Sequence, residues 1–178
     1  MISNSKNHGR EFGNIVKKDL YQISGIPQNY LDWVFDLGAN IGFFTVMVKM
    51  RHPYTKVVAV EGCQDTLCYL RQNLNMIHDS CIEDRPVGNG SILSLRQRQR
   101  KAHMLDNMFT TDETETYMIK SITIPELFEK YGCKKTDKYL IKINIEGAEQ
   151  AFIGDKEVDD ILRNSYMFVG MLHFKNVG

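Results

Sequence analysis

The chain has 178 residues with 22 basic and 22 acidic side chains, so we expect one domain with a real core and no net charge that attracts nucleic acid or an anionic membrane. Its four cysteines form neither a Cys-x-x-Cys pair nor a cluster with histidines, which argues against structural zinc and favours free thiols in a reducing compartment. The amino terminus lacks an apolar signal core and no stretch is apolar for long enough to span a bilayer, so we expect a cytoplasmic protein without membrane contact.

Residues 1–30 are predicted to form a helical cover segment, and residues 31–178 the main domain. The start of the segment is polar, and one helix is expected from Ile15 to Ile26, before the turn signals at Gly25 and Pro27. The role expected for this segment is structural.

Residues 33–60 predict a strand, a helix and a second strand. The run from Trp33 to Leu37 is apolar except for Asp36, as is typical of a strand buried on both faces of a parallel sheet. The sequence KVVAV at residues 56–60 predicts the next buried strand. A helix is expected between the two strands, because apolar side chains recur at helical spacing at Phe43, Phe44, Met47 and Met50.

A second helix and a third strand are expected to follow. Asp65 is a candidate cap for a helix whose apolar face holds Leu67, Leu70, Leu74 and Ile77. The third strand is expected near residues 81–83. Residues 85–116 are polar and rich in turn signals, and they include the basic string RQRQRK at 96–101. We favour a solvated loop or an edge strand there over a contact with nucleic acid.

Regular structure is predicted again from Thr123, where Thr-Ile-Pro-Glu indicates a capping box for a helix that ends at Gly132. Two further strands, at residues 139–145 and 167–174, flank a helix that begins near Gly147. Alternating strands and helices predict an α/β fold with an open, mostly parallel sheet and helices on both faces. In such a fold the ligand crevice lies outside the carboxyl ends of the strands.

The stretch between the first strand and its helix is suited to close contact with a ligand. Gly38 and Gly42 allow a sharp turn without a Cβ atom in the way, and Asn40 tolerates a left-handed conformation. The turn lacks the middle glycine that makes room for a pyrophosphate in dinucleotide-binding proteins. We therefore expect a ligand without a pyrophosphate.

Two acids accompany this turn. Glu61 ends the next strand, where a carboxylate can accept hydrogen bonds from both hydroxyls of an adenosine ribose, and Asp36 ends the first strand. An acidic site of this kind suits a cationic adenosine without phosphate, and S-adenosylmethionine carries a sulfonium and an ammonium group. The alternative is a generic turn with incidental carboxylates.

Four stretches occur in an order and spacing that together resemble a known family. They are Asp36-Leu-Gly-Ala-Asn-Ile-Gly with Thr45, Glu61 after VVAV, SITIPELFEKYG, and Ile141-Lys-Ile-Asn-Ile-Glu-Gly-Ala-Glu149. Over residues 33–173 the chain resembles the FkbM-type methyltransferases, a branch of the S-adenosylmethionine-dependent class I methyltransferases. The resemblance implies a Rossmann-like class I fold. The family usually adds a final helix and a pair of antiparallel strands, and because the sequence stops at Gly178 we expect part of these strands to be missing. It also implies S-adenosylmethionine as the cofactor and places Thr45 in the cofactor site.

Methyl transfer is an in-line displacement, so the protein has to position the acceptor and take up its proton. Glu146 and His173, each near the end of a strand, are the candidate acid and base groups. Asn144 stands where the family has an aspartate, which weakens a role there as base or metal ligand, and no metal is expected. Near the third strand, Glu83 and Asp84 are candidates for contact with the adenine amino group.

The expected function is O-methylation of a small-molecule acceptor, such as the hydroxyl of a sugar, a polyketide or another metabolite. The alternative is a noncatalytic S-adenosylmethionine-binding protein or scaffold remnant of the fold, since Asn144 carries no charge. A nicotinamide-dependent enzyme is disfavoured by the missing glycine. Neither nucleic acid nor membrane is expected as a partner, and an incomplete sheet edge leaves a homodimer open.

Overall fold

The computed structural model describes residues 6–97, 115–145, 148–151 and 154–170. The strands are β1 (Trp33–Leu37), β2 (Lys56–Val60), β3 (Ser80–Glu83), β4 (Ile92–Gln97), β5 (Glu115–Lys120), β6 (Tyr139–Ile143) and β7 (Met167–Gly170). The α-helices are α1 (Lys6–Phe12), α2 (Phe43–Arg51), α3 (Gln64–Leu74), α4 (Ile124–Tyr131) and α5 (Lys156–Asn164). Short helical turns are η1 (Gly13–Lys17), η2 (Ile23–Gly25) and η3 (Ala148–Ala151).

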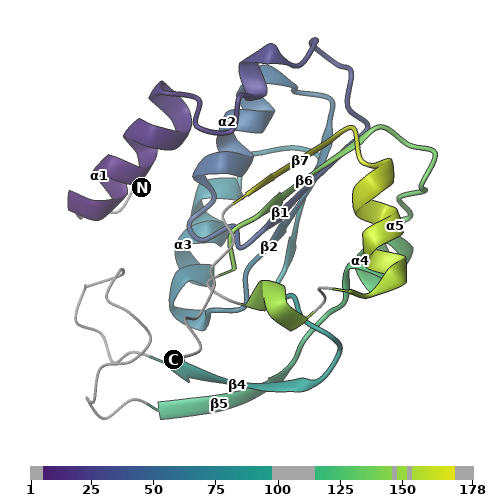
Figure 1. Ribbon diagram of the computed structural model, residues 1–178. Coiled ribbons are helices and arrows are strands. Elements are labelled where there is room, and N and C mark those ends of the chain that lie inside the picture. Colours follow the sequence, from purple (N-terminus) through teal and green to yellow (C-terminus); the bar gives the residue numbers. More distant parts are fainter. Residues whose placement is uncertain (1–5, 98–114, 146–147, 152–153, 171–178) are drawn as a thin grey trace, which may run out of the picture.

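The centre of the fold is a five-stranded sheet in the order β3-β2-β1-β6-β7, and each pair of neighbouring strands is parallel (Figure 1). The chain moves outward from β1 to β3 and then crosses to β6 on the other side of β1. The order therefore reverses beside β1, and ligands of open parallel sheets bind at such a switch point. The predicted α/β fold is confirmed.

Helices cover both faces of this sheet, as Figure 1 shows. On one face, Val34, Val57 and Leu140 pack against α2 and the N-terminal segment. On the other face, alternate strand residues such as Phe35 and Ile141 pack against α4 and α5. Because successive side chains of a strand point to opposite faces, β1, β2 and β6 need apolar residues at nearly every position. This explains why they could be recognised as continuous apolar runs.

The N-terminal segment differs from the expected helix at residues 15–26. The helix runs through α1 and η1 and ends at Lys17. Asp19 and Gln22 then adopt left-handed conformations, with φ of 50° and 56°. The Asp19 carboxylate accepts hydrogen bonds from the backbone N–H groups of Ile23 and Ser24, at 2.9 and 2.8 Å. A side chain that binds the following backbone in this way competes with a continuing helix.

Two details of the first helices also differ from the prediction. α3 begins two residues earlier than expected, with Cys63 instead of Asp65 as its N-cap, and Asp65 lies in its first turn. In α2, Phe43, Phe44 and Met47 are buried, but Met50 is 73 % exposed at the solvent side. Helical spacing alone did not indicate where the buried face of α2 ends.

A small antiparallel sheet of β4 and β5 stands apart from the main sheet (Figure 1). The polar stretch at 85–116 was expected to be a loop or an edge strand, and its described part contains β4. Arg96 and Gln97 end β4, while the rest of the basic string lies outside the described residues. The predicted capping box of α4 is confirmed, because the Thr123 hydroxyl accepts from Glu126 N and the Glu126 carboxylate accepts from Thr123 N. In the described part of the chain, no helix is long and apolar enough to cross a membrane.

Candidate functional site

The turn between β1 and α2 is built from left-handed residues. Gly38, Asn40 and Gly42 have φ angles of 79°, 52° and 89°. A Cβ atom on Gly38 would lie 2.0 Å from the carbonyl oxygen of Asn144, so only glycine lets the turn approach the end of β6. A Cβ atom on Gly42 would lie 2.8 Å from a methyl group of Leu70 in α3. The turn is thus fixed between β6 and α3 at the carboxyl end of the sheet.

Glu61 follows β2 and binds this turn. Its Oε2 accepts a hydrogen bond from Asn40 N at 2.8 Å, and its Oε1 accepts one from Cys63 N at 2.8 Å. Burial raises the pKa of Glu61 above its usual value, while the two backbone N–H groups act in the opposite direction. Each carboxylate oxygen keeps a further acceptor position beyond its backbone bond. The hydroxyls of a ribose diol could donate to these acceptor positions, and this contact with Glu61 stays a prediction.

Asp36 and Thr45 lie beneath the turn. Both side chains are fully buried, and the Thr45 hydroxyl donates to Asp36 Oδ2 at 2.8 Å. Lys142 of β6 forms an ion pair with the other Asp36 oxygen at 2.9 Å and donates to the carbonyl oxygen of Gly38 at 2.7 Å. The structure therefore gives Asp36 and Thr45 a supporting position under the turn.

Lys142 is a buried lysine in the middle of the sheet. It is only 3 % exposed and is paired with Asp36. The reason is its place in β6, which has a neighbouring strand on each side and helices over both faces. A charge in that position needs a partner close by.

The acids at the end of β3, Glu83 and Asp84, form ion pairs with basic side chains. Glu83 is buried and forms ion pairs with Arg85 at 2.8 Å and Lys130 at 2.6 Å. Asp84 is exposed and pairs with Arg71 at 3.1 Å. A contact of Asp84 with the adenine of a cofactor stays a prediction.

The candidate catalytic residues Glu146 and His173 lie outside the described residues. The backbone that leads to Glu146 is well held, because Asn144 N donates to the Leu37 carbonyl at 3.0 Å and Ile145 N donates to Glu149 Oε1 at 3.2 Å. Glu149 is 1 % exposed. Among the residues that the structure describes, no three His, Cys, Asp or Glu side chains gather closely enough to hold a metal ion.

Sequence reasoning missed two residues that contact the site. Glu11 of α1 accepts hydrogen bonds from the Asn40 side chain, with Nδ2 at 3.3 Å from both carboxylate oxygens. The Tyr117 hydroxyl of β5 donates to the carbonyl of Gly62 at 2.7 Å and accepts from Gln64 N at 3.2 Å. Both come from segments far from the turn in sequence, and neither belongs to a local motif.

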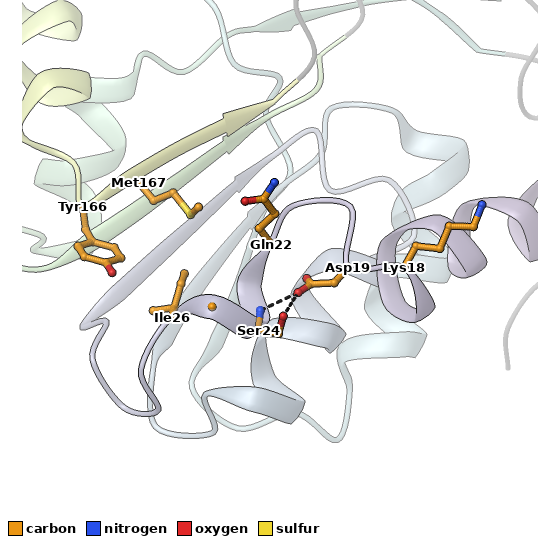
Figure 2. Close-up of a pocket in the computed structure, with 8 residues that line it drawn as sticks. Lys18, Asp19, Gln22, Ser24, Ile26, Tyr166 and Met167 are labelled. Carbon is orange, nitrogen blue, oxygen red and sulfur yellow. Dashed lines mark hydrogen bonds between the residues drawn. The ribbon is translucent and has the colours of Figure 1, made fainter.

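A pocket of about 740 Å³ lies elsewhere, between the N-terminal segment and the start of β7 (Figure 2). Met167, the first residue of β7, lines it, so the pocket lies at the amino end of that strand. The turn and Glu61 lie at the opposite, carboxyl end of the sheet. Asp19 is part of the pocket wall, and its carboxylate is already bound to Ser24, as Figure 2 shows. We therefore place the candidate site at the turn and not in this pocket.

Comparison with known proteins gives a family for this chain. The family model for the methyltransferase FkbM domain matches residues 36–176. None of the curated proteins compared with the chain matches it. Among solved structures, methyltransferase FkbM from Methylobacillus flagellatus KT is 14 % identical with a TM-score of 0.48, over 90 % of this chain and 36 % of that one. Precorrin-6y C5,15-methyltransferase from Geobacter metallireducens GS-15 is 11 % identical with a TM-score of 0.40, over 93 % of this chain and 59 % of that one. The chain spans less than two thirds of either protein, and by its match over residues 36–176 it belongs to the FkbM methyltransferase family.

Proposed function

We propose that the protein is an S-adenosylmethionine-dependent methyltransferase that methylates a hydroxyl group of a small molecule. Membership of the FkbM methyltransferase family supports the reaction class. The observation that carries the cofactor assignment is the contact between Glu61 and Asn40, which joins a carboxylate at the end of β2 to the turn after β1. The contact supports the proposal because a carboxylate beside the turn can accept hydrogen bonds from ribose hydroxyls, and because the turn lacks the middle glycine that makes room for a pyrophosphate.

The described residues fit this cofactor by their chemistry. Glu61 would hold the ribose, and the backbone of residues 38–40 would contact the methionine end. When bound, the cofactor supplies an electrophilic methyl group on a positively charged sulfur. Lys142 and Thr45 keep the turn in place through Asp36. We assign no direct contact with the cofactor to Asp36 or Thr45, since both are fully buried.

For the transfer itself, Glu146 is our candidate base that takes the proton of the acceptor hydroxyl. It follows the end of β6, directly after the backbone that Glu149 fixes at Ile145. His173 is the second candidate. Both assignments are tested by Glu146→Gln and His173→Gln, which should lower the rate of methyl transfer while cofactor affinity stays within about twofold.

A cofactor-binding protein without activity is the competing function, and Asn144 is the observation that favours it. Its side chain is neutral where the family usually has an aspartate. Its backbone N–H donates to the Leu37 carbonyl, and its carbonyl oxygen lies close against Gly38. Binding of S-adenosylmethionine without methyl transfer to a broad panel of hydroxyl acceptors would support this function. Transfer to any acceptor of the panel would exclude it.

Pairing of two copies into a homodimer is part of the same proposal. In the described part of the chain, β7 pairs on one side with β6 and forms an edge of the five-stranded sheet. An edge strand offers unpaired backbone groups to a second chain. Light scattering after size exclusion measures the mass directly, and a strictly monomeric mass at high protein concentration would contradict the pairing.

A further inference from the structure

The N-terminal helix reaches the cofactor turn. Glu11 of α1 accepts from the Asn40 side chain, and the neighbouring Phe12 packs edge-on against Phe43, with ring centroids 5.4 Å apart. Phe43 is the first residue of α2. α1 is therefore attached at the point where the turn becomes a helix, and Figure 1 shows α1 beside α2.

Asn40 lies between two carboxylates. Its backbone N–H donates to Glu61 at 2.8 Å, and its side-chain amide donates to Glu11 at 3.3 Å. Two acids from distant parts of the sequence thus contact the same residue of the turn. A ligand with its ribose at Glu61 would therefore lie next to a residue whose side chain is bound to Glu11.

The Glu11 charge also acts on the buried region beneath the turn. Tyr21 is 5 % exposed and packs against Phe44, with ring centroids 5.1 Å apart. Burial, followed by the charges of Asp36 and Glu11, raises the pKa of Tyr21 to about 12. The charges of Glu11 and Asp36 therefore both reach Tyr21, which packs under the start of α2.

We propose that Glu11 binds the cationic methionine end of S-adenosylmethionine, which makes α1 a part of the cofactor site. The inference rests on the proposed function. The ribose and the sulfonium of the cofactor are separated by one carbon, so a ribose held by Glu61 places the positive charges close to Asn40. A carboxylate on the far side of Asn40 supplies a counter-charge in a partly desolvated position, where such contacts are strong.

The test compares two ligands by calorimetry on the full chain: S-adenosylmethionine, and 5′-methylthioadenosine, which keeps the adenosine and lacks the sulfonium and the ammonium. Glu11→Gln should lower the affinity for S-adenosylmethionine about tenfold, because a charge-assisted contact becomes a neutral one. The same substitution should change the affinity for methylthioadenosine by less than about twofold. Glu129→Gln is the matched control, because Glu129 is an exposed acid of α4, and it should change neither affinity.

The salt dependence of the affinity for S-adenosylmethionine is a second test, and it does not require a measurement with methylthioadenosine. The affinity of the unchanged chain for S-adenosylmethionine should fall with added salt, and this fall should be shallower in Glu11→Gln. Glu11→Asp keeps the charge and should retain more affinity than Glu11→Gln. An equal salt dependence in the unchanged chain and in Glu11→Gln would overturn the proposal.

The ligand pattern separates this inference from the proposed function. Equal weakening of both ligands by Glu11→Gln would mean that Glu11 acts only through the conformation of Asn40, and would overturn the inference. The inference alone would also fail if Glu61→Ala weakened both ligands and Glu11→Gln weakened neither. Absence of binding of S-adenosylmethionine to the unchanged, folded chain would overturn the proposed function itself.

Discussion

The ammonium group of Lys142 lies 2.9 Å from the Asp36 carboxylate, and both residues are buried, at 3 % and 0 % exposure. The same ammonium donates to the carbonyl oxygen of Gly38 at 2.7 Å. β1 and β6 are paired in parallel with Asp36 opposite Lys142. The ion pair thus joins the two central strands directly under the turn at residues 38–42, and it links the stability of the sheet to the shape of the candidate site.

Replacement of Lys142 by methionine should destabilise the protein strongly. The side chain keeps a similar length, but Asp36 is left as a buried carboxylate without its cation. Loss of one partner from a buried ion pair typically costs about 3–5 kcal/mol. Urea unfolding followed by circular dichroism measures the change in the free energy of unfolding.

The matched control is the double variant Lys142→Met with Asp36→Asn. Removal of both charges should recover a large part of the loss, because no uncompensated charge remains in the core. If the loss of stability in the double variant equalled the sum of the losses in Lys142→Met and Asp36→Asn alone, the 2.9 Å contact would not act as an ion pair in solution.

Gly38→Ala should cost more stability than Gly132→Ala. Both glycines are left-handed, with φ of 79° and 76°, so both substitutions introduce a similar backbone strain. Only at Gly38 would the new Cβ atom meet the Asn144 carbonyl, at 2.0 Å. We expect about 1 kcal/mol at Gly132 and about 2–4 kcal/mol at Gly38 from thermal or urea unfolding. Equal costs at the two positions would show that β6 can move away from the turn.

Tyr117→Phe should weaken cofactor binding without unfolding the protein. The hydroxyl holds the loop between Glu61 and α3 through Gly62 and Gln64, so its loss should loosen the residues that position the Glu61 carboxylate. Loss of these hydrogen bonds predicts about three- to tenfold weaker binding in calorimetry. Tyr54→Phe, at a residue 77 % exposed, is the control. The same affinity in both variants would count against a positioning role of Tyr117.

Glu83→Gln should make the protein less stable at neutral pH and less sensitive to acid. Burial tends to raise the pKa of Glu83, but hydrogen bonds and charges of Arg85 and Lys130 outweigh burial and lower it below its ordinary value of 4.5. A lowered pKa contributes stability above the unfolded value, and this is lost as the pH falls through the folded value. The free energy of unfolding should therefore differ between the unchanged chain and Glu83→Gln by about 1–2 kcal/mol at neutral pH and by less in acid. Urea unfolding at several pH values measures this difference. A difference that stayed constant with pH would contradict the prediction.

The central sheet could be predicted because its signal is local. β1, β2 and β6 are short apolar runs, and the capping box at Thr123 fixes the start of α4 within a few residues. The N-terminal helix ends before the expected one, because the Asp19 side chain binds the backbone that follows it. α3 begins two residues before the expected cap at Asp65, with Cys63 as its N-cap. The β4–β5 hairpin was not expected as a pair, since its polar sequence gives no clear alternation of buried residues.

The candidate site could be predicted only where its residues follow one another in the chain. Gly38, Asn40 and Glu61 were expected at the turn, and the structure brings them together. Glu11 contacts the turn across 29 residues and Tyr117 contacts the Glu61 loop across 53 or more, so only tertiary packing creates these contacts. The burial of Lys142 also depends on which strands become central in the sheet, and no local pattern shows that.

Titration calorimetry of the full chain with S-adenosylmethionine shows whether the turn and Glu61 bind this cofactor. We predict saturable binding well below millimolar ligand, and a loss of at least about tenfold in affinity in Glu61→Ala, because the ribose loses a charged acceptor. If the folded chain did not bind the ligand at millimolar concentration, or if Glu61→Ala left the affinity unchanged, the turn and Glu61 would not be the binding site.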